Sequence, residues 1–74
     1  RKLTFKEERE LEALPARIEA LEKEREELHA TLSAPEIYRS AGATVAGLKA
    51  RREELERELE AAFIRWEELA SVRG

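Results

Sequence analysis

The stretch Leu11-Glu12-Ala13-Leu14-Pro15-Ala16-Arg17-Ile18-Glu19-Ala20-Leu21 decides the fold, because its apolar residues recur at alternating steps of three and four. That spacing places them along one stripe of a helix, as in the heptad repeat of a coiled coil. The stripe continues through Arg25, Leu28 and Leu32. After a short break, a second stripe runs through Val45, Leu48, Arg52, Leu55, Leu59, Ala62, Trp66 and Leu69. Two such stripes predict an all-α fold, a two-helix antiparallel coiled-coil hairpin.

The composition allows one small domain with a charged surface. Of the 74 residues, 42% are charged and 5% aromatic, a balance typical of a solvated coiled coil when helical periodicity is present. There is no cysteine to form a disulfide or a cysteine-type zinc site, which weakly indicates a reducing compartment. No apolar run approaches the ~20 residues that a membrane span needs, so we expect no membrane partner.

The sequence contains no methionine, so we expect it to be a piece of a longer protein. Residues 1–3, with the basic pair Arg1-Lys2, are interpreted as the end of a linker, and residues 4–74 as the hairpin.

The first helix is predicted over about residues 5–32. Thr4 and Glu7 have the spacing of a capping box, in which the Thr4 hydroxyl accepts from the Glu7 amide while the Glu7 carboxylate accepts from the Thr4 amide. Pro15 removes one backbone donor inside this helix and crowds the carbonyl one turn earlier. Because the apolar stripe stays in phase across it, we interpret Pro15 as a kink; two separate helices are the alternative.

The connection is predicted over residues 33–43. Ser33-Ala34-Pro35-Glu36 resembles a second capping box, followed by one short helical or 3₁₀ turn. Ile37 and Tyr38 on that turn are expected to plug the open end of the apolar stripe. The second helix is predicted over about residues 44–72, beginning between Ala43 and Val45 with Thr44 as a possible cap.

Charges beside the two stripes predict how the helices are aligned. In an antiparallel pair the heptad g positions face each other, and one alignment makes all three facing pairs opposite in charge. Those pairs are Glu10 with Arg65, Arg17 with Glu58, and Glu24 with Arg51. A slip of one heptad would instead oppose Arg17 with Arg65 and Glu24 with Glu58, which repel. Because exposed ion pairs stabilise little, they select the register more than they add stability.

No pattern of catalytic residues is present. The three glycines are scattered rather than gathered in a phosphate loop, and His29 is the only histidine, so no histidine metal cluster or catalytic dyad can form within the chain. The glutamates are spread over solvated helix faces. We therefore expect this chain, by itself, to be neither an enzyme nor a cofactor-binding or metal-binding protein.

A local basic surface is the one candidate site. The formal net charge is −3, which gives no reason to expect nucleic acid from the whole chain. The segment 23–52, however, contains six basic residues and four glutamates, while the ends carry the acid excess. The candidate nucleic-acid-binding residues, here called the loop-half cations, are Lys23, Arg25, Arg39, Lys49, Arg51 and Arg52. Such a patch can contact phosphates even on an acidic protein.

Other interpretations of the unusual residues remain open. Arg25 and Arg52 lie in the apolar stripes, where their stems could follow the groove while their guanidinium groups reach neighbouring glutamates. Trp66 and Phe63 are expected to pack in or beside the core rather than to stack on bases.

Three segments carry a resemblance to a known family. Leu3-Thr4-Phe5-Lys6-Glu7-Glu8-Arg9-Glu10-Leu11-Glu12-Ala13-Leu14-Pro15 resembles the opening motif of the C-terminal domain of Uup-type ABC-F ATPases. Pro35-Glu36-Ile37-Tyr38 is similar to the loop segment of that domain, and Phe63-Ile64-Arg65-Trp66-Glu67-Glu68-Leu69 to its closing motif. The matches fall at the start, middle and end, so the resemblance covers essentially the whole chain.

The resemblance implies a coiled-coil hairpin that follows two ATP-binding cassettes in a cytoplasmic ATPase. ATP and Mg²⁺ would bind in those cassettes, outside this chain. It also implies DNA as the partner, with ribosomal RNA or the ribosome as an alternative target. A protein-interaction arm that docks on the parent cassettes or on ribosomal protein is the runner-up. We expect the chain to be monomeric, with pairing of two chains through an open stripe as a further option.

Overall fold

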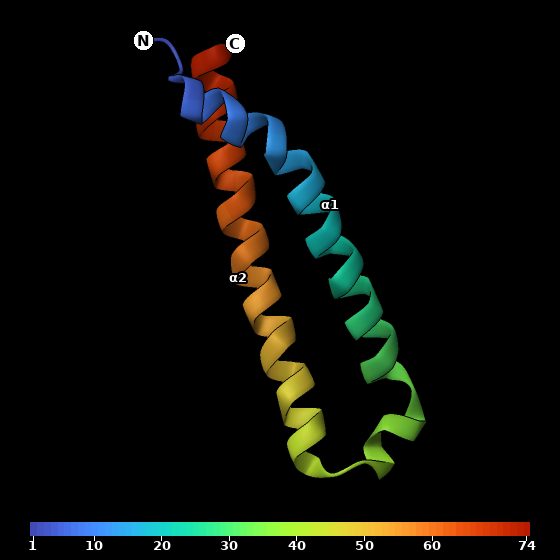
Figure 1. Cartoon of the computed structure of the whole chain (residues 1–74). Helices are drawn as coiled ribbons and strands as arrows, with labels where there is room; N and C mark the ends of the chain where they lie inside the picture. The colour runs from blue at the N-terminus through green and yellow to red at the C-terminus, as the bar shows by residue number, and fades with distance from the viewer.

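Two long helices lie side by side and antiparallel, joined by a short turn. The computed structural model describes all 74 residues: helix α1 (Phe5–Ser33), a 3₁₀ helix η1 (Pro35–Arg39) and helix α2 (Gly42–Arg73). Figure 1 shows both termini at one end of the hairpin and η1 at the other. The molecule is a rod of 54 × 16 × 15 Å. The predicted all-α antiparallel hairpin with a 3₁₀ turn in its connection is confirmed.

The core is the pair of apolar stripes that the heptads predict. Leu55 and Leu69 of α2 are fully buried, although only one other helix is available to cover them. The ten buried residues of the chain all belong to the predicted stripes: Leu11, Leu14, Ile18, Leu21, Leu28, Leu32, Leu55, Leu59, Ala62 and Leu69. Toward the turn the core thins out, because Val45 and Leu48 are only half-buried.

Helix α1 begins as predicted and is continuous through its proline. The Glu7 amide donates to the Thr4 hydroxyl (3.1 Å), and the Thr4 amide donates to the Glu7 carboxylate (2.9 Å), which closes the capping box. Pro15 lies inside one unbroken helix, so the alternative of two separate helices is wrong. Figure 1 shows α1 bending in its first half, as expected where proline removes a donor and crowds the preceding turn.

The connection differs from the prediction in both of its caps. No side chain caps η1, which follows Ala34, so Ser33 does not form a second capping box. Helix α2 begins at Gly42 after Ala41, again without a side-chain cap. Thr44 lies within the first turn, where its amide already donates to the Ala41 carbonyl (2.9 Å). Both helices therefore begin without a side-chain acceptor for their first amide groups.

Two aromatic predictions also require correction. Tyr38 does not plug the open end: it is 56% exposed, and its hydroxyl donates to the Leu32 carbonyl (2.6 Å), while Ile37 is only half-buried. Trp66 and Phe63 do not pack fully in or beside the core, because they are 41% and 44% exposed. A two-helix pair has no third element to cover the outer side of a large ring, so rings at its edge stay partly in water.

We predict that Leu55→Ala will destabilise the hairpin strongly. The side chain is 0% exposed, and deleting a buried leucine side chain to alanine costs about 2–5 kcal/mol. Ile64→Ala is the control, because Ile64 is half exposed and its substitution should cost about 0.5 kcal/mol or less. Urea unfolding followed by helical circular dichroism measures both values. Similar decreases in the two variants would contradict the assigned core.

Candidate functional site

One long side of the hairpin is closed by ion pairs between the helices. Arg65 donates from Nε and Nη2 to the two carboxylate oxygens of Glu10 (2.6 and 2.9 Å). Arg51 makes the same two-bond contact with Glu24 (2.7 and 2.8 Å). Between them, Arg17 donates to the Glu58 carboxylate (3.4 Å). These are the three pairs predicted from the g positions, so the predicted register is confirmed. We call this side the ion-paired flank, formed by Glu10, Arg17, Glu24, Arg51, Glu58 and Arg65.

The two-bond contacts shift the pKa values of the groups that they join. Hydrogen bonds from Arg65 hold the pKa of Glu10 below its ordinary value, and Arg51 does the same to the pKa of Glu24. Reciprocally, these carboxylates raise the pKa of both guanidinium groups. Each charged form is therefore favoured by the fold, as expected for carboxylates that accept bidentate arginine.

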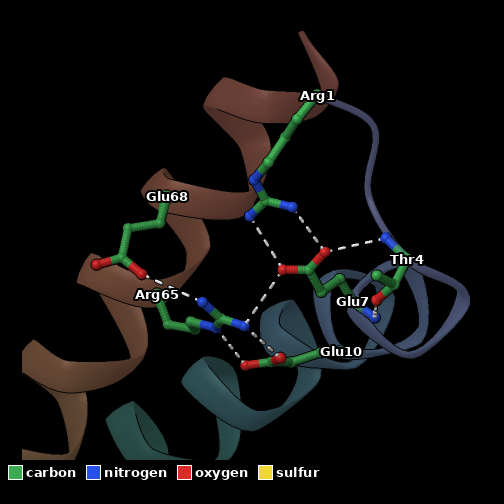
Figure 2. A network of polar contacts seen from close by, with 6 residues as sticks. All are labelled: Arg1, Thr4, Glu7, Glu10, Arg65 and Glu68. Carbon is green, nitrogen blue, oxygen red and sulfur yellow. Dashed lines mark hydrogen bonds and ion pairs between the residues drawn. The ribbon is translucent and has the colours of Figure 1, made fainter.

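A network at the terminal end joins the first residues of the chain to α2. Figure 2 shows Glu7 accepting from Arg1 and from the Thr4 amide, while Arg65 reaches toward Glu7 and bonds Glu10 and Glu68. The Arg1 guanidinium contacts both oxygens of Glu7 (2.9 and 3.1 Å). Hydrogen bonds from Arg1 and from the Thr4 backbone lower the pKa of Glu7 to about 2. This end is thus held by charge as well as by the capping box.

The six loop-half cations separate into two groups. Arg51 is already paired within the ion-paired flank, where it also contacts Glu54 (3.2 Å) and Glu58 (2.9 Å). Arg25 lies between two glutamates on opposite helices, Glu22 (3.9 Å) and Glu56 (3.5 Å). Its polar side chain in the apolar stripe therefore has partners at the groove edge, as one of the sequence interpretations expects. Neither arginine is freely available to a phosphate.

Four loop-half cations make no ion pair: Lys23, Arg39, Lys49 and Arg52. Arg39 ends η1, and Lys49 lies in the second turn of α2, so both are close to the turn. Arg52 is half-buried and lines a hollow together with Arg25, His29 and three glutamates, Glu22, Glu26 and Glu56. Lys23 occupies heptad position f, on the outer face of α1. We call Arg39, Lys49 and Arg52 the free tip cations, with Lys23 set apart from them.

The start of α2 adds to the positive character of this end. The helix has no side-chain cap and no acidic residue in its first turn. The partial positive charge of its first amide groups is therefore not neutralised by a carboxylate. The unpaired cations and the uncapped helix start together give the turn end of the hairpin local positive character.

Nothing in the arrangement points to catalysis. No group of three or more histidine, cysteine, aspartate or glutamate side chains could hold a metal ion. No buried polar side-chain atom lacks a hydrogen-bond partner. Neither helix has the length and apolar character required to cross a membrane. The geometry defines a small helical arm whose long sides and two ends differ in charge.

The family of this arm follows from comparison with known proteins. The family described as the ABC transporter C-terminal domain matches residues 2–71, and the chain belongs to it. Two curated relatives from Haemophilus influenzae, the ATP-binding protein Uup-like and the ATP-binding protein Uup, are each 48% identical over 74 residues, which is 99% of this chain. The resemblance to the C-terminal domain of Uup-type ABC ATPases is therefore confirmed.

The chain spans only a small part of these relatives. It covers 16% of the length of the Uup-like protein and 11% of the length of Uup. No solved structure matches the sequence.

We predict that the hairpin becomes less stable in acid, partly through Glu7. Because its folded pKa of about 2 lies below the ordinary 4.5, its contribution is fully present above pH 4.5 and disappears as the pH falls toward 2. Glu7→Gln should therefore lower the thermal midpoint at neutral pH and flatten its decline in acid. Glu60→Gln is the control, since Glu60 makes no ion pair. Parallel acid profiles for Glu7→Gln and the unchanged chain would contradict this assignment.

The predicted register can be tested by exchanging charges. Arg51→Glu places a carboxylate among Glu24, Glu54 and Glu58, so it should lower the thermal midpoint. Adding Glu24→Arg should restore part of the decrease by rebuilding the pair across the helices. The difference in thermal midpoint between Arg51→Glu and the double variant should shrink at about 1 M salt, where the Debye length falls to ~3 Å. A double variant no more stable than Arg51→Glu alone would count against this pairing.

Proposed function

We propose that this chain is a nucleic-acid-contacting arm of a cytoplasmic ABC-F ATPase, and that it binds DNA through the turn end of the hairpin. The observation that supports this most is the set of free tip cations, Arg39, Lys49 and Arg52, none of which makes an ion pair. Arginine and lysine that bind phosphates release condensed counterions, and this release drives sequence-independent affinity. In the parent protein, ATP and Mg²⁺ would bind in the cassettes outside this chain.

The shape of the molecule is consistent with such an arm. The turn lies at the far end of a 54 Å rod from the two termini (Figure 1). The acid excess lies away from the turn, in the segments 1–22 and 53–74. Placing the basic end away from the acidic segments reduces the repulsion that a chain of net charge −3 would otherwise meet near a polyanion.

The paired arginines have a different role in this proposal. The sequence offers Arg51 and Arg25 as candidate contact residues, but each is already paired with glutamates. Breaking those pairs to reach a phosphate would leave the glutamates unpaired beside it. We therefore assign these two arginines to the structure of the hairpin, and we expect Lys23 to contribute less than the free tip cations because it lies on the outer face of α1.

A salt titration with matched variants tests the proposal. Neutralising the free tip cations by Arg39→Gln, Lys49→Gln and Arg52→Gln should reduce the slope of log affinity against log salt for duplex DNA by about 2–3, since each phosphate that is no longer bound lowers the slope by about 0.9. The control carries Lys6→Gln, Arg57→Gln and Arg73→Gln, which remove the same charge from unpaired residues elsewhere. It should keep the slope.

The alternatives predict other outcomes of the same titration. An equal reduction of the slope in the two triple variants would mean that only net charge matters, and the turn would not be the binding surface. Tighter binding to a ribosomal RNA hairpin than to duplex DNA would make RNA the partner. Failure to bind either ligand at low salt would favour the protein-interaction or ribosome-docking arm.

A further inference from the structure

The side of the hairpin opposite the ion-paired flank carries an apolar groove near the termini. Part of it, about 350 Å³, is lined by Pro15 and Ile18 of α1 and by Phe63, Trp66 and Glu67 of α2. A second part, about 370 Å³, shares Pro15 and Trp66 and continues toward the termini. That part is lined by Leu11, Glu12, Pro15, Trp66, Ala70, Arg73 and Gly74. The two parts form one groove with the Trp66 indole between them.

The rings in this groove are too exposed to belong to the core. Trp66 and Phe63 are 41% and 44% exposed, although both lie next to the apolar stripe. Single exposed apolar residues are ordinary on protein surfaces, but contiguous ones indicate an interaction surface. Aromatic side chains are also the type enriched where partners bind. Because the two-helix pair leaves Trp66 and Phe63 partly in water, the two rings offer an apolar surface that a third helix can cover.

Unpaired acidic residues follow both edges of the groove. Heptad position b lies beside this flank on each helix. Near the groove it is glutamate at 12 and 19 in α1 and at 60 and 67 in α2, and toward the turn the two rows continue with Glu26 and Glu53. The four near the groove are exposed, and none takes part in an ion pair. Glu12 and Glu67 line the groove directly, and the single cation that lines it is Arg73. The surface is thus apolar in the middle and negative at both sides.

The groove also has a free polar group. The Trp66 indole N–H makes no hydrogen bond within the chain. Because Trp66 lines both parts of the groove, this donor can orient a bound segment.

From these features, we propose that the groove binds a cationic amphipathic α-helix, a segment with leucine-like side chains along one face and lysine or arginine on both sides of it. The apolar face would cover Phe63 and Trp66 and complete a three-helix packing, while the basic residues would meet the two rows of glutamates. This is the helix-in-groove mode, in which apolar residues three, four and seven apart anchor the ligand. A second copy of this chain fits poorly, because it would bring the same glutamate rows against each other.

Trp66 provides the measurement, because it is the only tryptophan of the chain. The probe is a tryptophan-free amphipathic peptide of leucine and lysine, about 18 residues long because shorter helices are marginal in water. Binding should move Trp66 emission to shorter wavelength and saturate at one peptide per chain. A peptide of the same pattern with glutamate in place of lysine should leave the emission unchanged. A shift of Trp66 emission with chain concentration alone would overturn the proposal in favour of self-association.

Two variants and a matched control locate the binding surface. Glutamine at Glu12 and Glu67, the two glutamates that line the groove, should weaken peptide binding about fivefold, from two screened surface contacts. The control places glutamine at Glu27 and Glu36, two unpaired glutamates outside the groove, and should stay within about twofold of the unchanged chain. Phe63→Ser should also weaken binding about tenfold. Circular dichroism checks that each variant keeps its helices.

The result that would overturn the proposal is equally specific. If the control weakens the peptide as much as the groove variant does, the attraction is only to net charge. Unchanged affinity after Phe63→Ser would show that the rings take no part. The result is independent of DNA binding at the turn, since none of the groove residues belongs to the free tip cations.

Discussion

Burial of one apolar seam between two helices is the constraint on which the whole molecule depends. The chain has no disulfide, and no metal cluster replaces it. Only ten residues are buried, and most belong to one continuous cluster from Leu11 to Leu69. With so small a core, each fully covered leucine carries a large share of the stability, and the charged residues must be arranged so that none is buried unpaired. Any binding surface must therefore lie on the outer faces of the two helices.

The heptads are sufficient to predict the fold and even the register. The stripe positions identify the buried leucines, and the signs of three facing pairs, such as Glu24 with Arg51, are enough to choose one alignment. Both depend on local periodicity, which a single sequence records directly. The predicted caps at Ser33 and Thr44 are wrong because a hydroxyl near a helix start competes with backbone carbonyls, and the outcome depends on the turn geometry.

The candidate site is harder to predict from the sequence, because a count of charges does not show which cations are paired. Counting charges over a segment treats Arg51 and Arg39 alike, although one is bound by three glutamates and the other by none. The predicted register already pairs Arg51 with Glu24. Leaving paired residues out of the charge count would therefore remove Arg51 from the candidates. The exposure of Trp66 cannot be predicted from the heptad pattern, because a heptad position does not reveal whether a third element covers the ring.

Arg25 divides the side opposite the ion-paired flank into two regions of different chemistry. Glu22 and Glu56 would repel each other across the helices, and the guanidinium group lies between them instead of a leucine side chain. On the terminal side of this contact lies the apolar groove. On the turn side lies a polar hollow in which Arg25 and Arg52 lie among Glu22, Glu26 and Glu56. A leucine at position 25 would deepen the seam but leave two facing carboxylates unneutralised. The polar residue lowers the stability of the seam, and in return it separates the apolar groove near the termini from a hollow of mixed charge nearer the turn.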